Sequence, residues 1–152
     1  MPGWRASIER VAKQVTRPDT EFYIRFPKED LGQWSKGIRI GSSEFNVRYL
    51  QYILQAEKDG FDAVILGCFL DPALDEAKEI CNIPIVGPAE ASILFAHLFA
   101  NKYAIVTFPP LRNRYLIEKL IDLYGFRSKA INNPVRLLSY PESDLWDIAR
   151  GR

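Results

Sequence analysis

The sequence has few of the residues that usually bind metals or form disulfides. Its 152 residues include one histidine, His97, and two cysteines, Cys68 and Cys81. No CxxC or HxxxH pattern lies beside the cysteines, so a zinc site is not expected. Two cysteines in a chain of this length do not make a disulfide framework. His97 lies in a helical apolar pattern and is interpreted as a packed side chain.

Long apolar runs, phosphate loops and an excess of one charge are also missing. No run approaches the roughly 20 apolar residues that cross a bilayer, and the N-terminus lacks a signal-peptide core. Neither GxGxxG nor GxxxxGK[ST] occurs. The 20 Lys and Arg residues nearly balance the 19 Asp and Glu residues and form no basic stripe. These absences argue against membrane and nucleic-acid partners and make the cytoplasm the default compartment.

What the sequence does contain is an alternation of helical and strand patterns, in a length that suits one domain. The expected strands are Phe22–Phe26, Phe61–Gly67, Ile83–Val86, Tyr103–Phe108 and Val135–Ser139. The expected helices are Trp4–Val15, Ser43–Gly60, a short one after Asp71, Pro88–Phe99, one between Pro110 and Gly125, and a weak turn at Asp144–Ala149. The polar composition of Lys28–Ser42 predicts a long loop. The order predicts an α/β fold, a parallel sheet with helices on both faces.

Two side chains with useful chemistry stand at strand ends. Cys68 ends an apolar run and Thr107 ends another, and sites in parallel sheets form beyond the carboxyl ends of strands. Asp71 is expected to cap the next helix, with Pro72 at its first position. The positive end of that helix would lower the pKa of Cys68 from about 8.5. Position alone leaves an inert, buried cysteine equally open.

Three segments resemble one known family. They read G-F-D-A-V-I-L-G-C-F-L-D-P-A-L, then I-P-I-V-G-P-A-E-A-S, then Y-A-I-V-T, and they occur in this order between Ala56 and Phe108. Together they are similar to the first half of hydantoin racemases, in the aspartate/glutamate racemase superfamily. The resemblance implies two pseudo-symmetric, flavodoxin-like lobes with the site between them, and no cofactor.

The resemblance also implies a mechanism. In the family, two cysteines face each other across the substrate's α carbon, and one removes the proton while the other returns a proton to the opposite face. Cys68 matches the first-lobe cysteine, and Thr107 matches a threonine near the substrate's anionic end. Phe69, Phe108 and Glu90 are further expected to bind the substrate. The implied activity is the racemisation of a small molecule: a hydantoin, allantoin or an amino acid. Uncovered strand edges and apolar faces further predict a homo-oligomer.

The chain departs from the family pattern in two places. Family members normally begin with a strand before the first helix, and this chain has no such strand. The second-lobe cysteine also has no counterpart, since Cys81 lies in the same lobe as Cys68. We therefore expect a truncated chain with impaired activity on its own, with residues 1–100 as the first lobe without its first strand and residues 101–152 as the start of the second lobe. Two alternatives stay open: a one-cysteine decarboxylase or other lyase of the superfamily, and a non-catalytic remnant or interaction domain.

Overall fold

The computed structural model describes residues 2–26, 43–107 and 111–139. In chain order these form α1 (Pro2–Val15), α3 (Ser43–Lys58), β1 (Val64–Ile65), α4 (Leu74–Ile80), β2 (Ile85–Val86), α5 (Pro88–Phe99), β3 (Tyr103–Thr107), α6 (Leu111–Leu123), the 3-10 turn η1 (Arg127–Lys129) and β4 (Ala130–Leu137). The expected α/β class is thereby confirmed. The expected loop at Lys28–Ser42 and the expected turn at Asp144–Ala149 lie outside the described residues.

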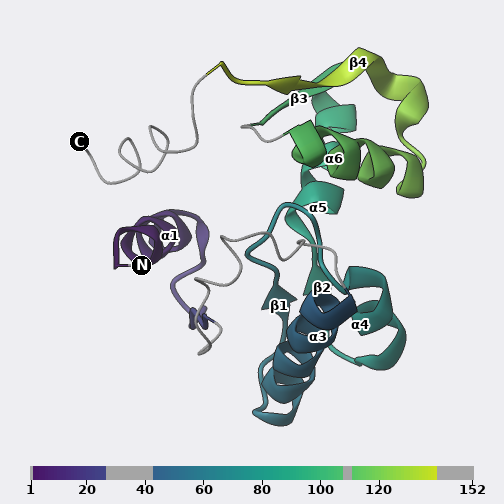
Figure 1. The fold of residues 1–152 in the computed structure, drawn as a ribbon. Coiled ribbons are helices and arrows are strands. Elements are labelled where there is room, and N and C mark those ends of the chain that lie inside the picture. Colours follow the sequence, from purple (N-terminus) through teal and green to yellow (C-terminus); the bar gives the residue numbers. More distant parts are fainter. Residues whose placement is uncertain (1, 27–42, 108–110, 140–152) are drawn as a thin grey trace.

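The described strands form two parallel pairs rather than one continuous sheet. β1 pairs with β2 through Val64 and Ile85, and β3 pairs with β4 through Tyr103 and Ala130. A helix connects the two strands of each pair, as a parallel crossover requires. Figure 1 shows α3 and α4 beside the first pair, α6 beside the second pair, and α5 between the two groups.

The expected strand at Phe22–Phe26 is wrong. Its side chains do alternate between half-buried and exposed, but the segment joins neither sheet. Side chains hold it instead: Arg25 forms an ion pair with Asp59 at 2.8 Å and lies over the Phe61 ring. The alternation of apolar and polar residues therefore shows which side of this segment faces the protein. It does not show a strand, because no neighbouring strand pairs with the segment.

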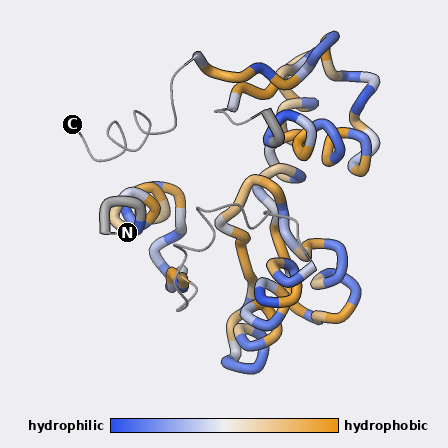
Figure 2. Tube along the Cα trace, in the orientation of Figure 1, coloured by the Kyte–Doolittle hydropathy of each residue, from blue (hydrophilic) through white to orange (hydrophobic). Residues whose placement is uncertain are grey.

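The interior consists of two apolar clusters that share one side chain. The first cluster is Ile53, Leu66, Leu74, Ala77 and Ile85, and the second is Ile93, Tyr103, Ile117, Ile121 and Val135. Tyr124 packs against both clusters, so it links the two strand pairs. In Figure 2 β1 and β2 carry mainly hydrophobic colour, whereas β4 combines hydrophobic and hydrophilic stretches.

Helix α5 is buried on one side only. Ile93 is almost fully buried, but Phe95 is 58% exposed and Phe99 is 83% exposed. The helical spacing of these two phenylalanines predicts core positions, and that prediction is wrong. The cause is that α5 is apolar nearly all round, while the described residues pack against only one of its faces. Ile65 of β1 is similarly 77% exposed, so one face of that strand is uncovered within the described residues.

Candidate functional site

Cys68 lies in a tight turn directly after β1. The backbone N–H of Asp71 donates to the carbonyl of Cys68 at 3.0 Å, which closes the turn. The side chain of Cys68 is partly buried. The following helix, α4, begins only at Leu74, and its N-cap is Ala73, in a left-handed conformation (φ 59°) with no side-chain cap. The expected cap at Asp71 and the expected first helical position at Pro72 are therefore wrong.

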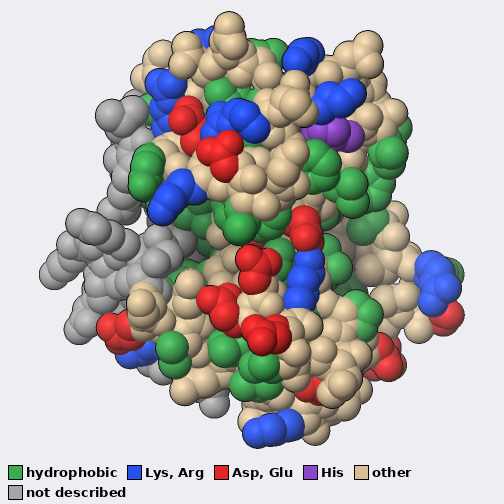
Figure 3. Space-filling view, turned by 90° about the vertical axis from the view of Figure 1, so that its right-hand side faces the viewer, with side chains coloured by type: hydrophobic (Ala, Val, Ile, Leu, Met, Phe, Trp, Pro, Cys, Tyr) green, Lys and Arg blue, Asp and Glu red, His purple; other side chains and the backbone are tan. Residues whose placement is uncertain are grey.

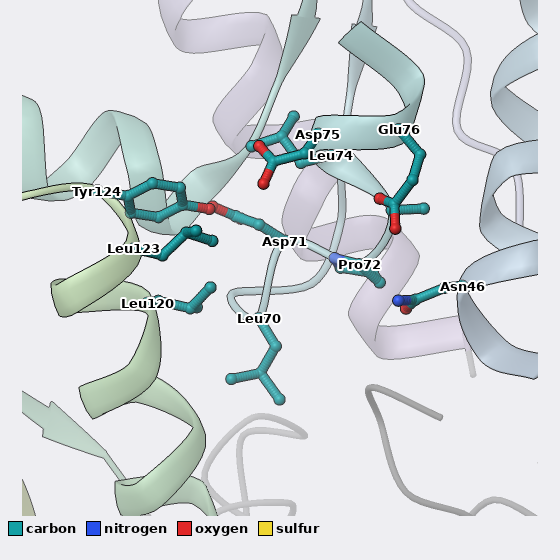
Figure 4. Close-up of a pocket in the computed structure, with 11 residues that line it drawn as sticks. Asn46, Leu70, Asp71, Pro72, Leu74, Asp75, Glu76, Leu120, Leu123 and Tyr124 are labelled. Carbon is teal, nitrogen blue, oxygen red and sulfur yellow. The ribbon is translucent and has the colours of Figure 1, made fainter. Parts of the chain in front are cut away.

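Asp71 caps a different helix, α5. Its carboxylate accepts hydrogen bonds from the backbone N–H groups of Ala89 (3.0 Å) and Glu90 (2.8 Å) at the start of that helix. It also accepts one from the phenol of Tyr124, at 2.7 Å. Asp71 is 6% exposed, and Figure 4 shows its side chain reaching toward the Tyr124 hydroxyl. A buried carboxylate suits this place because free N–H groups and the helix dipole both favour an anion.

Sequence reasoning missed this arrangement because its partners are distant along the chain. Ala89 is 18 residues from Asp71 and Tyr124 is 53 residues away. One signal was present, the glycine before α5. An ideal Cβ on Gly87 would lie 2.5 Å from the carboxyl carbon of Asp71 and 2.6 Å from a methyl carbon of Leu74. Only a residue without a side chain allows Asp71 to approach the helix in this way.

The surroundings of Cys68 favour the protonated thiol. Burial raises the pKa of the Cys68 thiol, the negative charge of Asp71 raises the pKa further, and a hydrogen bond from the Leu70 backbone opposes both. Burial, followed by the proximity of Cys68, raises the pKa of Tyr49 on α3 to about 12. The expectation that a helix N-terminus would lower the Cys68 pKa is wrong, because α4 begins too late in the chain.

The other expected substrate-binding residues are dispersed. Phe69, beside Cys68, is exposed. Glu90 lies in the first turn of α5, but its carboxylate forms an ion pair with Lys78 of α4 at 2.6 Å. Thr107 ends β3, in the other strand pair, where its carbonyl accepts a hydrogen bond from Leu138 at 2.7 Å. Phe108 lies outside the described residues.

A cavity of about 220 Å³ opens beside the Asp71 turn (Figure 4). Residues of α3, the turn, α4 and α6 line it: Asn46, Leu70, Asp71, Asp75, Glu76, Leu120 and Tyr124 are among them. The side-chain oxygen of Asn46 is buried and has no hydrogen-bond partner among the described residues. Acidic side chains also gather across the middle of the face shown in Figure 3.

Within residues 2–26, 43–107 and 111–139, no group of three or more His, Cys, Asp or Glu residues is placed to hold a metal ion. In the same ranges no helix has both the length and the apolar character to cross a membrane.

The parallel strands and their connecting helices define an α/β protein. Its candidate site lies at a strand end, where the thiol of Cys68 follows the first strand. The family model described as Asp/Glu/Hydantoin racemase matches residues 6–137. The chain therefore belongs to the Asp/Glu/hydantoin racemase family.

Individual relatives agree with this assignment. A hydantoin racemase of Pseudomonas sp. (strain NS671) is 31% identical over 134 residues, which are 82% of this chain and 49% of that protein. A hydantoin racemase of Rhizobium meliloti is 33% identical over 94 residues, 59% of this chain and 39% of that protein. The structure of an allantoin racemase from Klebsiella pneumoniae superposes with a TM-score of 0.78 at 26% identity, covering 98% of this chain and 60% of the other. The chain thus spans about half the length of the first of these relatives.

Proposed function

We propose that this chain is part of a cofactor-independent racemase or epimerase in which Cys68 transfers a proton at the α carbon of a small molecule. The observation that carries the proposal is the place of Cys68: a partly buried thiol just beyond β1 in a chain of the racemase family. Cys81 is a poor alternative, because it ends α4 and packs against the first apolar cluster.

The substrate class follows from the relatives. Two of them are named hydantoin racemases and a third is named an allantoin racemase. Hydantoins and allantoin share a five-membered ring in which the stereogenic carbon stands next to a carbonyl group. That carbonyl makes the C–H bond acidic, since the electron pair left behind can be held as an enolate. We therefore favour a 5-substituted hydantoin over a free amino acid.

Inversion needs one group on each face of the ring. A base on one face takes the proton, the electron pair moves onto the carbonyl, and an acid on the other face delivers a proton to the carbon. Because burial and Asp71 raise the pKa of Cys68, the resting thiol is protonated and is suited to deliver that proton. Cys68 becomes a thiolate in this step and can take the proton in the reverse direction. The group on the opposite face is not assigned within the described residues.

The proposal also covers substrate binding, domain organisation and self-association. Thr107, Phe69, Phe108 and Glu90 are proposed to bind the substrate, and residues 1–100 and 101–152 are proposed to belong to two lobes. The exposed apolar side of α5 supports self-association. A cytoplasmic location and cofactor independence are likewise proposals.

The test is deuterium incorporation at the α carbon of a 5-substituted hydantoin in D₂O, followed by mass spectrometry. The chain should incorporate deuterium above the buffer rate, and C81S should do the same. C68S should fall to the buffer rate, because a hydroxyl does not replace a thiol as the proton carrier near neutral pH. Equal incorporation by C68S and by the unchanged chain would reject the proposal. Release of carbon dioxide from a malonate substrate would indicate a lyase instead.

A further inference from the structure

We propose that Asp71 is a positioning residue for Cys68, because one buried carboxylate ties the cysteine turn to α5 and to α6. The inference uses the proposed function only in taking Cys68 as the reactive group.

The first argument is the number of connections that meet at Asp71. Its own backbone N–H closes the turn onto the carbonyl of Cys68. Its side chain accepts hydrogen bonds from the two free N–H groups at the start of α5 and from the phenol of Tyr124, directly after α6. A shift of either helix therefore acts on the turn that holds the thiol. No substrate contact is needed for this role.

The second argument is that the arrangement is held under constraint. Asp71 has a positive φ of 45°, a conformation that residues other than glycine seldom adopt. The Asp71 carboxylate and Leu74 approach Gly87 so closely that they leave no room for a side chain at this position. Buried polar connections of this kind hold one arrangement, since each lost partner leaves an unpaired polar group. The geometry therefore fixes both the position of the turn and the place of a negative charge near Cys68.

The pKa of the Cys68 thiol depends on the negative charge of Asp71. Tyr49 on α3 lies near the Cys68 thiol, and the carboxylates of Asp71, of Glu90 on α5 and of Asp75 on α4 lie near the phenol of Tyr124, which directly follows α6. The Asp71 charge disfavours the Cys68 thiolate, and the Tyr124 hydroxyl partly offsets that charge by donating to it. Removing the carboxylate and removing the phenol hydroxyl should consequently move the thiol pKa in opposite directions. General loosening of the fold would move both in the same direction.

The experiment is the pH dependence of iodoacetamide alkylation, measured in two single-thiol proteins. The C81S protein reports on Cys68, and the C68S protein reports on Cys81 in the same fold. D71N keeps the side-chain shape but removes the charge and replaces one acceptor with a donor, so it cannot accept both N–H groups. Y124F removes only the hydroxyl. Y115F, which alters an exposed phenol on the same helix, is the matched control.

We expect D71N to move the alkylation midpoint of Cys68 to lower pH and to leave that of Cys81 in place. Y124F should move the Cys68 midpoint to higher pH, and Y115F should move neither. An unmoved Cys68 midpoint in D71N, or an equal shift at both cysteines, would overturn the proposal. If D71N does not fold, Y124F decides alone: a Cys68 midpoint that stays or falls overturns it. The readout needs no turnover, so a failure here is distinct from a failure of the racemase proposal.

Discussion

Gly87→Ala is the substitution whose effect the structure specifies most closely. A new Cβ at this position would meet the Asp71 carboxyl carbon at 2.5 Å, one carboxylate oxygen at 2.6 Å and a Leu74 methyl carbon at 2.6 Å. Atoms do not approach this closely, so Asp71 or the start of α5 must move. Because Asp71 is buried and caps α5, either movement weakens its hydrogen bonds.

The cost has two parts. A hydrogen bond to a charged group contributes about 1.5–3 kcal/mol, and forcing a methyl group into a packed site costs about 1–3 kcal/mol. Loss of one bond together with the overpacking gives a decrease of about 2.5–6 kcal/mol in the free energy of unfolding. A typical domain has a stability of about 5–15 kcal/mol, so the variant should still fold.

Urea unfolding followed by the circular dichroism of the helices measures this decrease, which should lower the midpoint by about 1–3 M. Gly67→Ala is the matched control, because nothing lies within 4 Å of its ideal Cβ. That control should change the stability by less than about 1 kcal/mol in either direction. Equal midpoints for the two variants would refute the assigned packing of Asp71 against Gly87.

Further predictions concern the candidate site and the surface. If Cys68 carries the proton as proposed, C68S should lower turnover by orders of magnitude, whereas C81S should alter only stability; steady-state racemisation and urea unfolding measure these two effects. Thr107→Val should weaken substrate binding or turnover about tenfold without unfolding the chain, since it removes one hydrogen bond to a charged or carbonyl group; unchanged kinetics would make Thr107 purely structural. Burial raises the Cys68 pKa, so its alkylation should require higher pH than that of a peptide thiol with a pKa of about 8.5, and a profile at or below the peptide's would contradict this. The chain should sediment as a dimer or larger species because α5 exposes Phe95 and Phe99, and a monomer at high concentration would oppose this.

The local pattern of the sequence predicted most elements correctly. The helix after Ser43 ends near Gly60, and the helix before Gly125 ends there, and both glycines have positive φ values of 83° and 74°. The strands at Ile85–Val86 and Tyr103–Thr107 also fall within the predicted ranges. These elements depend on neighbouring residues, because periodicity and a left-handed glycine determine where a helix ends.

What the sequence could not predict depends on contacts between distant residues. Asp71-Pro72 has the sequence of a helix start, yet the Asp71 carboxylate accepts hydrogen bonds from the free N–H groups of α5 instead. A helix beginning directly after Cys68 would lower the pKa of its thiol. In the structure this pKa is raised instead, because burial and the Asp71 charge outweigh the Leu70 hydrogen bond. The alternation at Phe22–Phe26 predicted a strand, but strand formation also needs a partner strand. Periodicity cannot show which apolar faces are covered, as Phe99 illustrates.

The most direct test of the central claim is to measure deuterium incorporation separately for the two enantiomers of one 5-substituted hydantoin. If Cys68 serves a single face of the ring, the chain should exchange the α proton of one enantiomer faster than that of the other, and C68S should abolish the difference. Equal exchange of both enantiomers, unchanged in C68S, would contradict the claim that Cys68 carries the proton.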